Sequence, residues 1–194
     1  CNGRYQTEIF NSVTVTTVNY SDVYTDNAHE MDIYTPDGDT ETNRPVILFV
    51  HGGSFYGGDK LDAYCVDFCE EFAKKGYVVA SVNYRLVSLL NIVSFLSNHD
   101  EQYEEVLKAT FDLKAAVRFF RKDYANGDVY GIDPNTIFRM ADTKSEDKCT
   151  SEALTRSFFS VDNGLNMQLT SQAIDSTFGS DAVITKSVFD VAFD

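Results

Sequence analysis

The sequence predicts an α/β fold in which helices flank a mostly parallel sheet. Residues 45–50 and 77–82 are two apolar runs of the kind found in strands that are covered on both faces, as parallel strands are. Residues 60–75 lie between the two runs and carry apolar side chains at helical spacing. A strand, a helix and a strand joined by short turns form a βαβ unit, whose right-handed crossover makes the two strands parallel.

Two further stretches before this unit are expected to be extended. Residues 7–24 are rich in Thr, Val and Tyr, which predicts one or two strands. Residues 31–34 predict another short strand, which ends at the turn residues that follow it. The helix over residues 60–75 is expected to have Asp59 as its N-cap and Gly76 just beyond its carboxyl end.

A long amphipathic helix is predicted over residues 101–125, and Asn126 and Gly127 end it. A further strand is expected to begin at Thr136. The residues expected on the inner face of the long helix are Tyr103, Val106, Leu107, Thr110, Leu113, Val117, Phe120 and Tyr124.

The segment 86–98 is apolar but lacks a clean period, and two interpretations stay open. It is either a buried loop or short helix, or an apolar rim beside a substrate pocket.

Composition limits the partners that this protein can have. The 194 residues contain 16 Lys and Arg against 30 Asp and Glu, which gives a net charge of −14. Such acidity argues against nucleic acid and anionic membrane surfaces as partners, because both repel it. No stretch approaches the ~20 apolar residues of a membrane span, so no integral membrane segment is expected.

The four cysteines lack the spacing of a zinc site, and neither a metal ion nor a cofactor is expected. Cys65 and Cys69 are four residues apart, which places them on one face of a helix. They are either buried thiols or part of a disulfide to the amino terminus, for example from Cys1 to Cys69. Such a bridge requires an oxidising compartment. The chain begins at Cys1 with no Met before it, so we expect a removed export signal and a secreted, periplasmic or cell-surface protein.

The segment His51-Gly52-Gly53-Ser54-Phe55 directly follows the first buried strand. Two glycines after a parallel strand allow a sharp turn whose backbone N–H groups face the carboxyl end of the sheet. Paired N–H groups stabilise the oxyanion that forms when a carbonyl is attacked, and losing one costs roughly 10²–10³ in rate. The alternative is an ordinary glycine-rich turn. No phosphate-binding glycine pattern is present.

Five segments together resemble the amino-terminal half of α/β-hydrolases of the carboxylesterase/lipase type. The opening CNGRY is similar to exported bacterial esterases. The resemblance covers about residues 1–138 and leaves residues 139–194 as a divergent tail, packed on the same domain or not. The segments are residues 31–36, 45–55, 72–86, 115–121 and 131–138.

The resemblance implies carboxylic ester hydrolysis through an acyl-enzyme, with a small ester or acyl compound as ligand. It assigns the oxyanion hole to Gly52, Gly53 and Ser54, with His51 supporting the motif. The family places its G-x-S-x-G nucleophile elbow near residues 141–145, where this sequence reads ADTKS. Thr143 occupies the nucleophile position, and a β-branched residue fits the strained elbow poorly.

The catalytic base of the family is also missing. The three histidines are at positions 29, 51 and 99, whereas the family's base is a His near its carboxyl terminus. Residues 139–194 are also too few for the remaining βα units, since a βαβ unit needs ~30 residues or more. We therefore expect an inactive chain of esterase descent. A non-catalytic secreted binding domain and a truncated fragment remain the alternatives.

Overall fold

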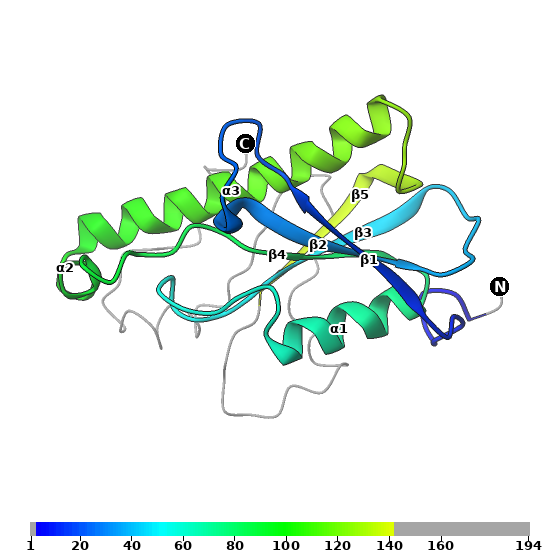
Figure 1. Cartoon of the computed structure of the whole chain (residues 1–194), viewed down its shortest axis with the longest axis horizontal. Helices are drawn as coiled ribbons and strands as arrows, with labels where there is room; N and C mark the ends of the chain where they lie inside the picture. The colour runs from blue at the N-terminus through cyan, green and yellow to red at the C-terminus, as the bar shows by residue number, and fades with distance from the viewer. Residues whose placement is uncertain (1–2, 142–194) are drawn as a thin grey trace.

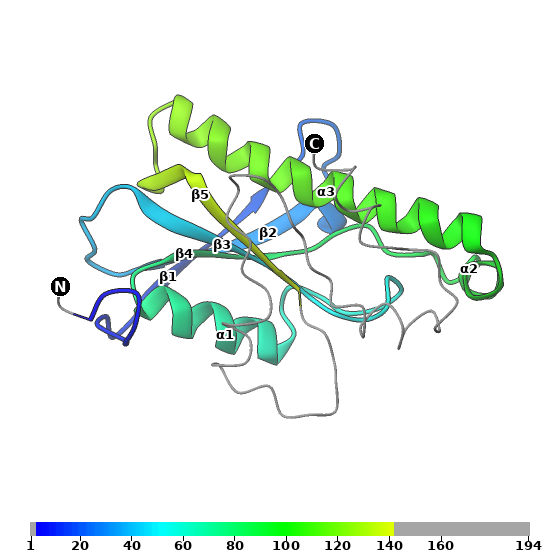
Figure 2. The ribbon, with the colours of Figure 1, turned by 180° about the vertical axis from the view of Figure 1, so that it is seen from behind.

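The computed structural model describes residues 3–141. A single sheet lies between two helical layers, with α1 on one face and α3 on the other (Figures 1 and 2). The elements in chain order are β1 (Val13–Asn19), η1 (Asn27–His29), β2 (Glu30–Pro36), β3 (Arg44–Val50), α1 (Ala63–Lys74), β4 (Val78–Val82), α2 (Ile92–Ser97), α3 (His99–Ala125) and β5 (Ile132–Ala141).

The sheet is mixed, which corrects the expectation of a mostly parallel one. Its strand order is β1-β2-β4-β3-β5. The predicted βαβ unit is confirmed, because β3 and β4 pair in parallel around α1, and β5 pairs in parallel with β3. In contrast, β2 pairs antiparallel with both β1 and β4. The connection between β1 and β2 is shorter than the dozen or more residues of a parallel crossover, so these neighbours must run in opposite directions.

Strand β3, which lies between β4 and β5 in the sheet, is buried on both faces, as its apolar run predicts. Val46 and Leu48 pack in the core on the α3 side. Ile47 and Phe49 pack in the core on the α1 side, together with Cys65 and other residues of α1. Strand β3 therefore packs in both cores, which fixes the position of the residue at which the next loop begins.

Helix α1 begins later than expected. Its N-cap position is Asp62, not Asp59. The Asp59 carboxylate instead accepts the backbone N–H of Leu61 at 2.9 Å, and the Asp59 carbonyl accepts that of Asp62 at 3.0 Å, so a turn precedes the helix. The predicted end is confirmed, because Gly76 adopts a positive φ of 102° directly after the C-cap residue.

Helix α3 ends where predicted and begins two residues earlier than predicted, but not all of the predicted inner face is confirmed. Tyr103 and Tyr124 are exposed, while Gln102 and Asp112 are buried instead. The spacing of apolar residues cannot predict a buried Asp, because the burial of its carboxylate depends on a cationic partner from another element. The cap is Asn98, whose side chain accepts the backbone N–H of Asp100 at 2.9 Å.

The segment 86–98 contains the short helix α2, but most of its large side chains are not buried. Phe95 alone among the residues of α2 is buried. Leu89, Leu90 and Val93 are among the most exposed apolar residues within residues 3–141. The short helix of the first interpretation is confirmed, but the burial that it assumed is not, and the interpretation as an apolar rim beside a substrate pocket stays a prediction.

Cys65 and Cys69 both lie in the core on the α1 side, in agreement with their interpretation as buried residues. Burial raises the pKa of the Cys69 thiol well above its ordinary value. No disulfide forms between them. The pairing of Cys69 with Cys1 stays a prediction, because Cys1 lies outside the described residues.

The boundary expected at residue 138 falls within β5, which continues to Ala141. Thr143 and the rest of the proposed tail lie outside the described residues. No helix within residues 3–141 combines the length and the apolar character that crossing a membrane requires.

Candidate active site

The loop of residues 51–58, here called the glycine loop, leaves the carboxyl end of β3 in a tight left-handed turn. Gly53, Ser54 and Phe55 all have positive φ, at 122°, 55° and 66°. The Gly53 carbonyl accepts the backbone N–H groups of Tyr56 at 3.1 Å and Gly57 at 3.0 Å. A Cβ atom on Gly53 would lie 2.1 Å from the Gly57 oxygen, so only glycine fits there.

The three expected oxyanion donors differ in whether their backbone N–H group has an acceptor within residues 3–141. The backbone N–H of Gly52 donates to the hydroxyl oxygen of Tyr64, the second residue of α1, at 3.0 Å. The N–H groups of Gly53 and Ser54 donate to no acceptor within residues 3–141, and both residues are partly exposed. Of these three adjacent amides, only that of Gly52 is engaged within residues 3–141.

His51 supports the loop from inside the molecule. Its ring is buried and stacks on Tyr84, with the ring centroids 4.6 Å apart. Its Nδ1 lies 2.8 Å from the Gly52 carbonyl oxygen and donates to it, because a carbonyl can only accept. Burial lowers the pKa of His51, which favours the neutral ring. This geometry suits a support for the turn and not a general base.

The segment after β4 holds the same loop from a second side. The Val87 backbone N–H donates to the Phe55 carbonyl at 2.7 Å. The Tyr84 hydroxyl donates to the His51 carbonyl at 3.2 Å, and its ring meets the Phe55 ring edge-on. The glycine loop is thus bonded to this segment at its first residue, His51, and near its middle, at Phe55.

A buried polar network that sequence reasoning missed fixes the exit of the loop. The Lys60 Nζ donates to the Asp32 carboxylate at 2.8 Å, and both side chains are almost fully buried. The Lys60 backbone N–H donates to Asn83 Oδ1 at 2.6 Å, and its carbonyl accepts the Ser81 hydroxyl at 2.8 Å. One signal was available, since an Asp in the middle of a short apolar strand needs a cationic partner.

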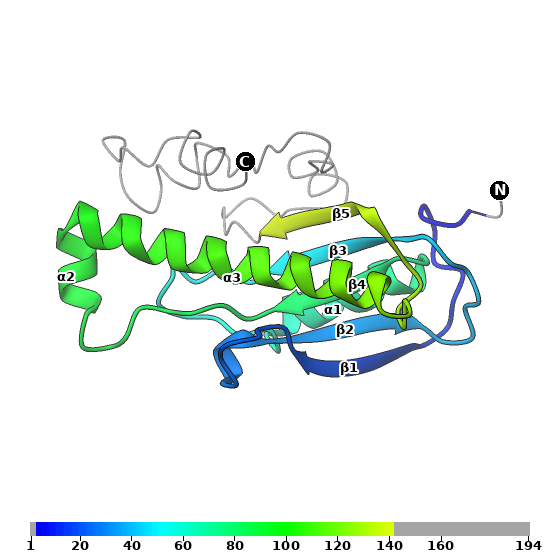
Figure 3. The ribbon, with the colours of Figure 1, turned by 90° about the horizontal axis from the view of Figure 1, so that it is seen from above.

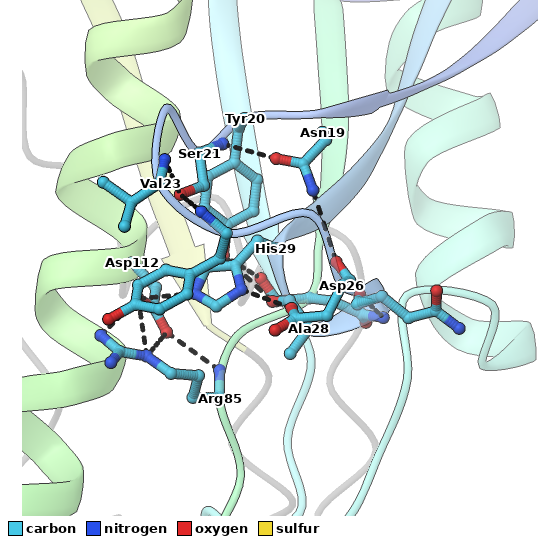
Figure 4. A network of polar contacts seen from close by, with 12 residues as sticks. Asn19, Tyr20, Ser21, Val23, Asp26, Ala28, His29, Arg85 and Asp112 are labelled. Atoms are coloured by element: carbon cyan, nitrogen blue, oxygen red, sulfur yellow. Dashed lines mark hydrogen bonds and ion pairs between the residues drawn. The ribbon is translucent and has the colours of Figure 1, made fainter.

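A second network anchors Arg85, the residue after Tyr84 (Figure 4). The Asp112 carboxylate accepts the Arg85 backbone N–H at 3.0 Å and its Nη2 at 2.7 Å. Buried His29 lies between two carboxylates, with Nδ1 2.5 Å from Asp26 and Nε2 3.5 Å from Asp112. Helix α3 therefore fixes the start of the segment that supports the glycine loop.

Within residues 3–141, no group of three or more His, Cys, Asp or Glu side chains is placed to hold a metal ion.

Apart from Asp26 and His29, the residues of this arrangement lie within the region that a known family covers. The family model of BD-FAE matches residues 31–145, from β2 through the glycine loop to the end of β5 and slightly beyond. The chain belongs to the BD-FAE family. BD-FAE is an α/β-hydrolase-type esterase domain, so the resemblance to esterases that the segments indicated is confirmed for this part of the chain.

Among curated proteins, Gut esterase 1 of Caenorhabditis elegans is 30% identical over 95 residues, which are 48% of this chain and 15% of that protein. Among solved structures, the thermophilic esterase Est2 of Thermogutta terrifontis is 25% identical, with a TM-score of 0.48 over 66% of this chain and 40% of that one. A truncated carbohydrate esterase from gut microbiota is 22% identical, with a TM-score of 0.49 over 70% of this chain and 41% of that one. This BD-FAE chain thus spans less than half the length of each of these three relatives.

Proposed function

We propose that this chain carries the oxyanion-stabilising part of a carboxylic ester hydrolase, with the backbone amides of Gly53 and Ser54 as the donors. The observation that supports this is the pair of adjacent N–H groups shortly after β3 that have no acceptor within residues 3–141. Because the chain belongs to an esterase family, the oxygen atom proposed to bind this pair of N–H groups is that of an ester carbonyl. The proposed ligand is a small ester or acyl compound whose carbonyl oxygen lies against the two amides.

The chemistry follows from where charge develops. Attack on an ester carbonyl moves a negative charge onto its oxygen, and N–H groups that already point to that position stabilise it without reorganisation. Gly52 is left out of the proposed pair because its N–H is committed to Tyr64. The left-handed backbone at Gly53 and Ser54 is held by Val87, Tyr84 and His51, so the donors are fixed before a ligand arrives.

The isolated 194-residue chain is proposed not to turn esters over. A hydroxyl nucleophile needs a base that removes its proton, and no His follows His99 in this sequence. Thr143, at the family's nucleophile position, has neither flanking glycines nor an identifiable base. His51 is a poor substitute, because it is buried and its Nδ1 proton is donated to Gly52.

The test is an assay of 4-nitrophenyl butyrate hydrolysis together with labelling by a fluorophosphonate probe, on the wild-type chain and on Thr143→Ala. We expect no turnover above the buffer rate and no covalent label on either protein. Turnover or labelling that Thr143→Ala abolishes would contradict the proposed inactivity and would make Thr143 the nucleophile.

A non-catalytic binding domain is the second candidate, favoured by two amides without an acceptor within residues 3–141 and by the lack of a His after His99 in the given sequence. Saturable binding of a neutral ester without labelling supports it over an active enzyme.

The proposed location is outside the cytoplasm, and the mass of the intact chain tests it. Loss of two hydrogen atoms relative to the reduced chain supports a bridge such as Cys1 to Cys69, whereas four free thiols argue against it.

A further inference from the structure

His29 is a buried histidine whose ring lies between two carboxylates (Figure 4). Its Nδ1 is 2.5 Å from the Asp26 carboxylate, and its Nε2 is 3.5 Å from Oδ1 of Asp112, near the middle of α3. Figure 3 shows α3 extending along the sheet, so the second contact joins this helix to the connection between β1 and β2. Nε2 forms no hydrogen bond in the described part of the chain, so its approach to Asp112 is electrostatic.

The two contacts determine which protons the ring carries. A carboxylate only accepts, so Nδ1 must donate to Asp26. This hydrogen bond holds the pKa of the Asp26 carboxyl below its ordinary value, which keeps Asp26 ionised. Without a proton on Nε2, the lone pair of that nitrogen would face the Asp112 oxygen and the two would repel each other. With a proton on both nitrogens the ring of His29 is a cation, and both contacts are attractive.

The charged groups around the ring also favour the cation. Asp26 and Asp112 bring two negative charges, and Arg85, which is paired with Asp112, brings one positive charge. A charged His29 therefore makes these four side chains neutral as a group.

Two phenols complete the surroundings of the ring in the described part of the chain. The rings of Tyr20 and Tyr24 lie 5.9 and 4.5 Å from the His29 ring. Burial raises the pKa of Tyr20 far above its ordinary value, so this phenol stays neutral. Tyr24 stacks on the imidazole and also lies 5.4 Å from the Arg85 guanidinium, and an aromatic face attracts cations.

The segment that carries His29 is bonded to the segment after β4. The Asn83 backbone N–H donates to the Glu30 carbonyl at 3.0 Å, and its Nδ2 donates to the Asn27 carbonyl at 3.2 Å. These two acceptors lie on either side of His29 in the sequence. A displacement of His29 therefore moves the acceptors of Asn83, which directly precedes residues 84–87.

Residues 84–87 in turn hold the glycine loop, by ring stacking and by hydrogen bonds to its backbone. Within this segment, Arg85 donates to both oxygens of the Asp112 carboxylate. One of these oxygens, Oδ1, is the one that Nε2 of His29 approaches. His29 is therefore linked to the glycine loop by two routes, one through Asn83 and one through Arg85.

We propose that doubly protonated His29 is a positioning residue for the Gly53 and Ser54 amides, so that binding of a neutral ester weakens as the pH rises and the ring loses its second proton. The ester rests on the proposed function, whereas the link between His29 and the glycine loop requires no ligand. Loss of the proton turns the Nε2 lone pair toward Asp112, so the ring moves away from the carboxylate and takes its segment with it. The glycine loop then loses part of its support.

The first measurement follows imidazole and backbone resonances of the ¹⁵N-labelled chain without ligand, from pH 6.5 to pH 9. We expect both ring nitrogens of His29 to be protonated at pH 6.5, and the Gly53 and Ser54 amides to shift at the same midpoint as the ring. His29→Gln should displace both amides at pH 6.5 and abolish their titration. His99→Gln is the control, since His99 is exposed at the start of α3. Burial lowers the pKa of His51, which keeps its ring neutral over most of this range.

A second pair of variants separates positioning from mere structural support. Asp26→Asn removes one carboxylate from the ring of His29, so the midpoints of the ring and of the glycine-loop amides should move together to lower pH. Asp22→Asn is the matched control, because Asp22 lies in the same connection but pairs with the exposed Lys122. Both changes are at exposed side chains and should leave the fold intact.

The last measurement is the dissociation constant of ethyl butyrate at the two ends of the pH range. We expect it to be about fivefold higher or more at pH 9, and to be equally high at both pH values in His29→Gln. The proposal is overturned by equal affinity at both pH values, by a His29 ring with a single protonated nitrogen at pH 6.5, or by glycine-loop amides that ignore His29→Gln. No binding of ethyl butyrate at any pH would contradict the proposed function, and the resonances without ligand would still decide the role of His29.

Discussion

The backbone N–H of Gly52 donates to the hydroxyl oxygen of Tyr64 at 3.0 Å. This bond joins the glycine loop to the first turn of α1, and it removes one of three adjacent amides from the set that a ligand can use. In the proposed oxyanion site, Gly53 and Ser54 are then the pair that remains, since neither N–H has an acceptor within residues 3–141. The position of α1 relative to β3 therefore sets which amides are open.

Tyr64→Phe tests this relationship. The variant removes the acceptor, so the partly exposed Gly52 amide must find water, and we expect a loss of about 1 kcal/mol in the free energy of unfolding. Urea denaturation measures the loss, and the ¹⁵N–¹H spectrum should show a large change at Gly52. An unchanged Gly52 resonance would show that the bond does not form in solution.

Gly53→Ala should destabilise the fold more than an alanine at another glycine with the same backbone strain. Gly127 is the matched control, because its φ is 130° and nothing lies within 4 Å of its Cβ position. We expect Gly127→Ala to cost about 1 kcal/mol from conformation alone. Gly53→Ala adds the collision with the Gly57 carbonyl, so its cost in denaturant unfolding should exceed about 2 kcal/mol. Equal costs would mean that the loop relaxes freely.

Lys60→Met should be among the most damaging single changes to the fold. It leaves the Asp32 carboxylate buried with only the Thr17 hydroxyl at 2.6 Å as a polar side-chain contact in the described part of the chain. Breaking a buried pair in this way costs about 3–5 kcal/mol. Lys122→Met is the control, since the Lys122–Asp22 pair is exposed and its loss should leave the melting temperature unchanged. Asp32→Asn in the Lys60→Met background should recover part of the loss.

The buried His51 ring predicts a pH dependence of stability. Burial lowers its pKa in the folded chain, so the unfolded chain binds the proton first as the pH falls. The stability that neutral His51 contributes is therefore complete above its ordinary pKa of about 6.5 and is lost as the pH drops through the lowered value. The difference in unfolding free energy between the wild type and His51→Gln should shrink between pH 7.5 and pH 5. A difference that grows on acidification would contradict the assignment.

The sequence alone predicted the β3–α1–β4 unit, but not the direction of β2 or the whole inner face of α3. β3, β4 and α1 were correct because their apolar residues recur at strand or helix spacing with clear turn residues between them. The direction of β2 was missed because strand patterns carry no direction, although the short connection to β1 carried the information. On α3, Tyr103 and Tyr124 were wrongly placed on the inner face, and the buried Asp112 was missed because its burial depends on its bond to Arg85, outside the helix.

The candidate site was found from the sequence as a motif but not as a set of donors. Two glycines after a buried strand located the turn, and the structure places Gly52, Gly53 and Ser54 together in it. The bond that withdraws Gly52 comes from Tyr64, twelve residues away on a helix, and no local pattern predicts such a contact. For the Lys60–Asp32 pair, the Asp within an apolar strand signalled that a cation was needed, but no local pattern identified Lys60, 28 residues away, as that cation.

The most direct measurement is a titration of the ¹⁵N-labelled chain with ethyl butyrate, a neutral ester that the net charge does not repel. If Gly53 and Ser54 are the oxygen-binding donors, their amide protons shift downfield together and saturably, while the Gly52 amide stays where Tyr64 holds it. Saturable shifts that bypass Gly53 and Ser54, or no saturable shift at either amide, would contradict this account of the site.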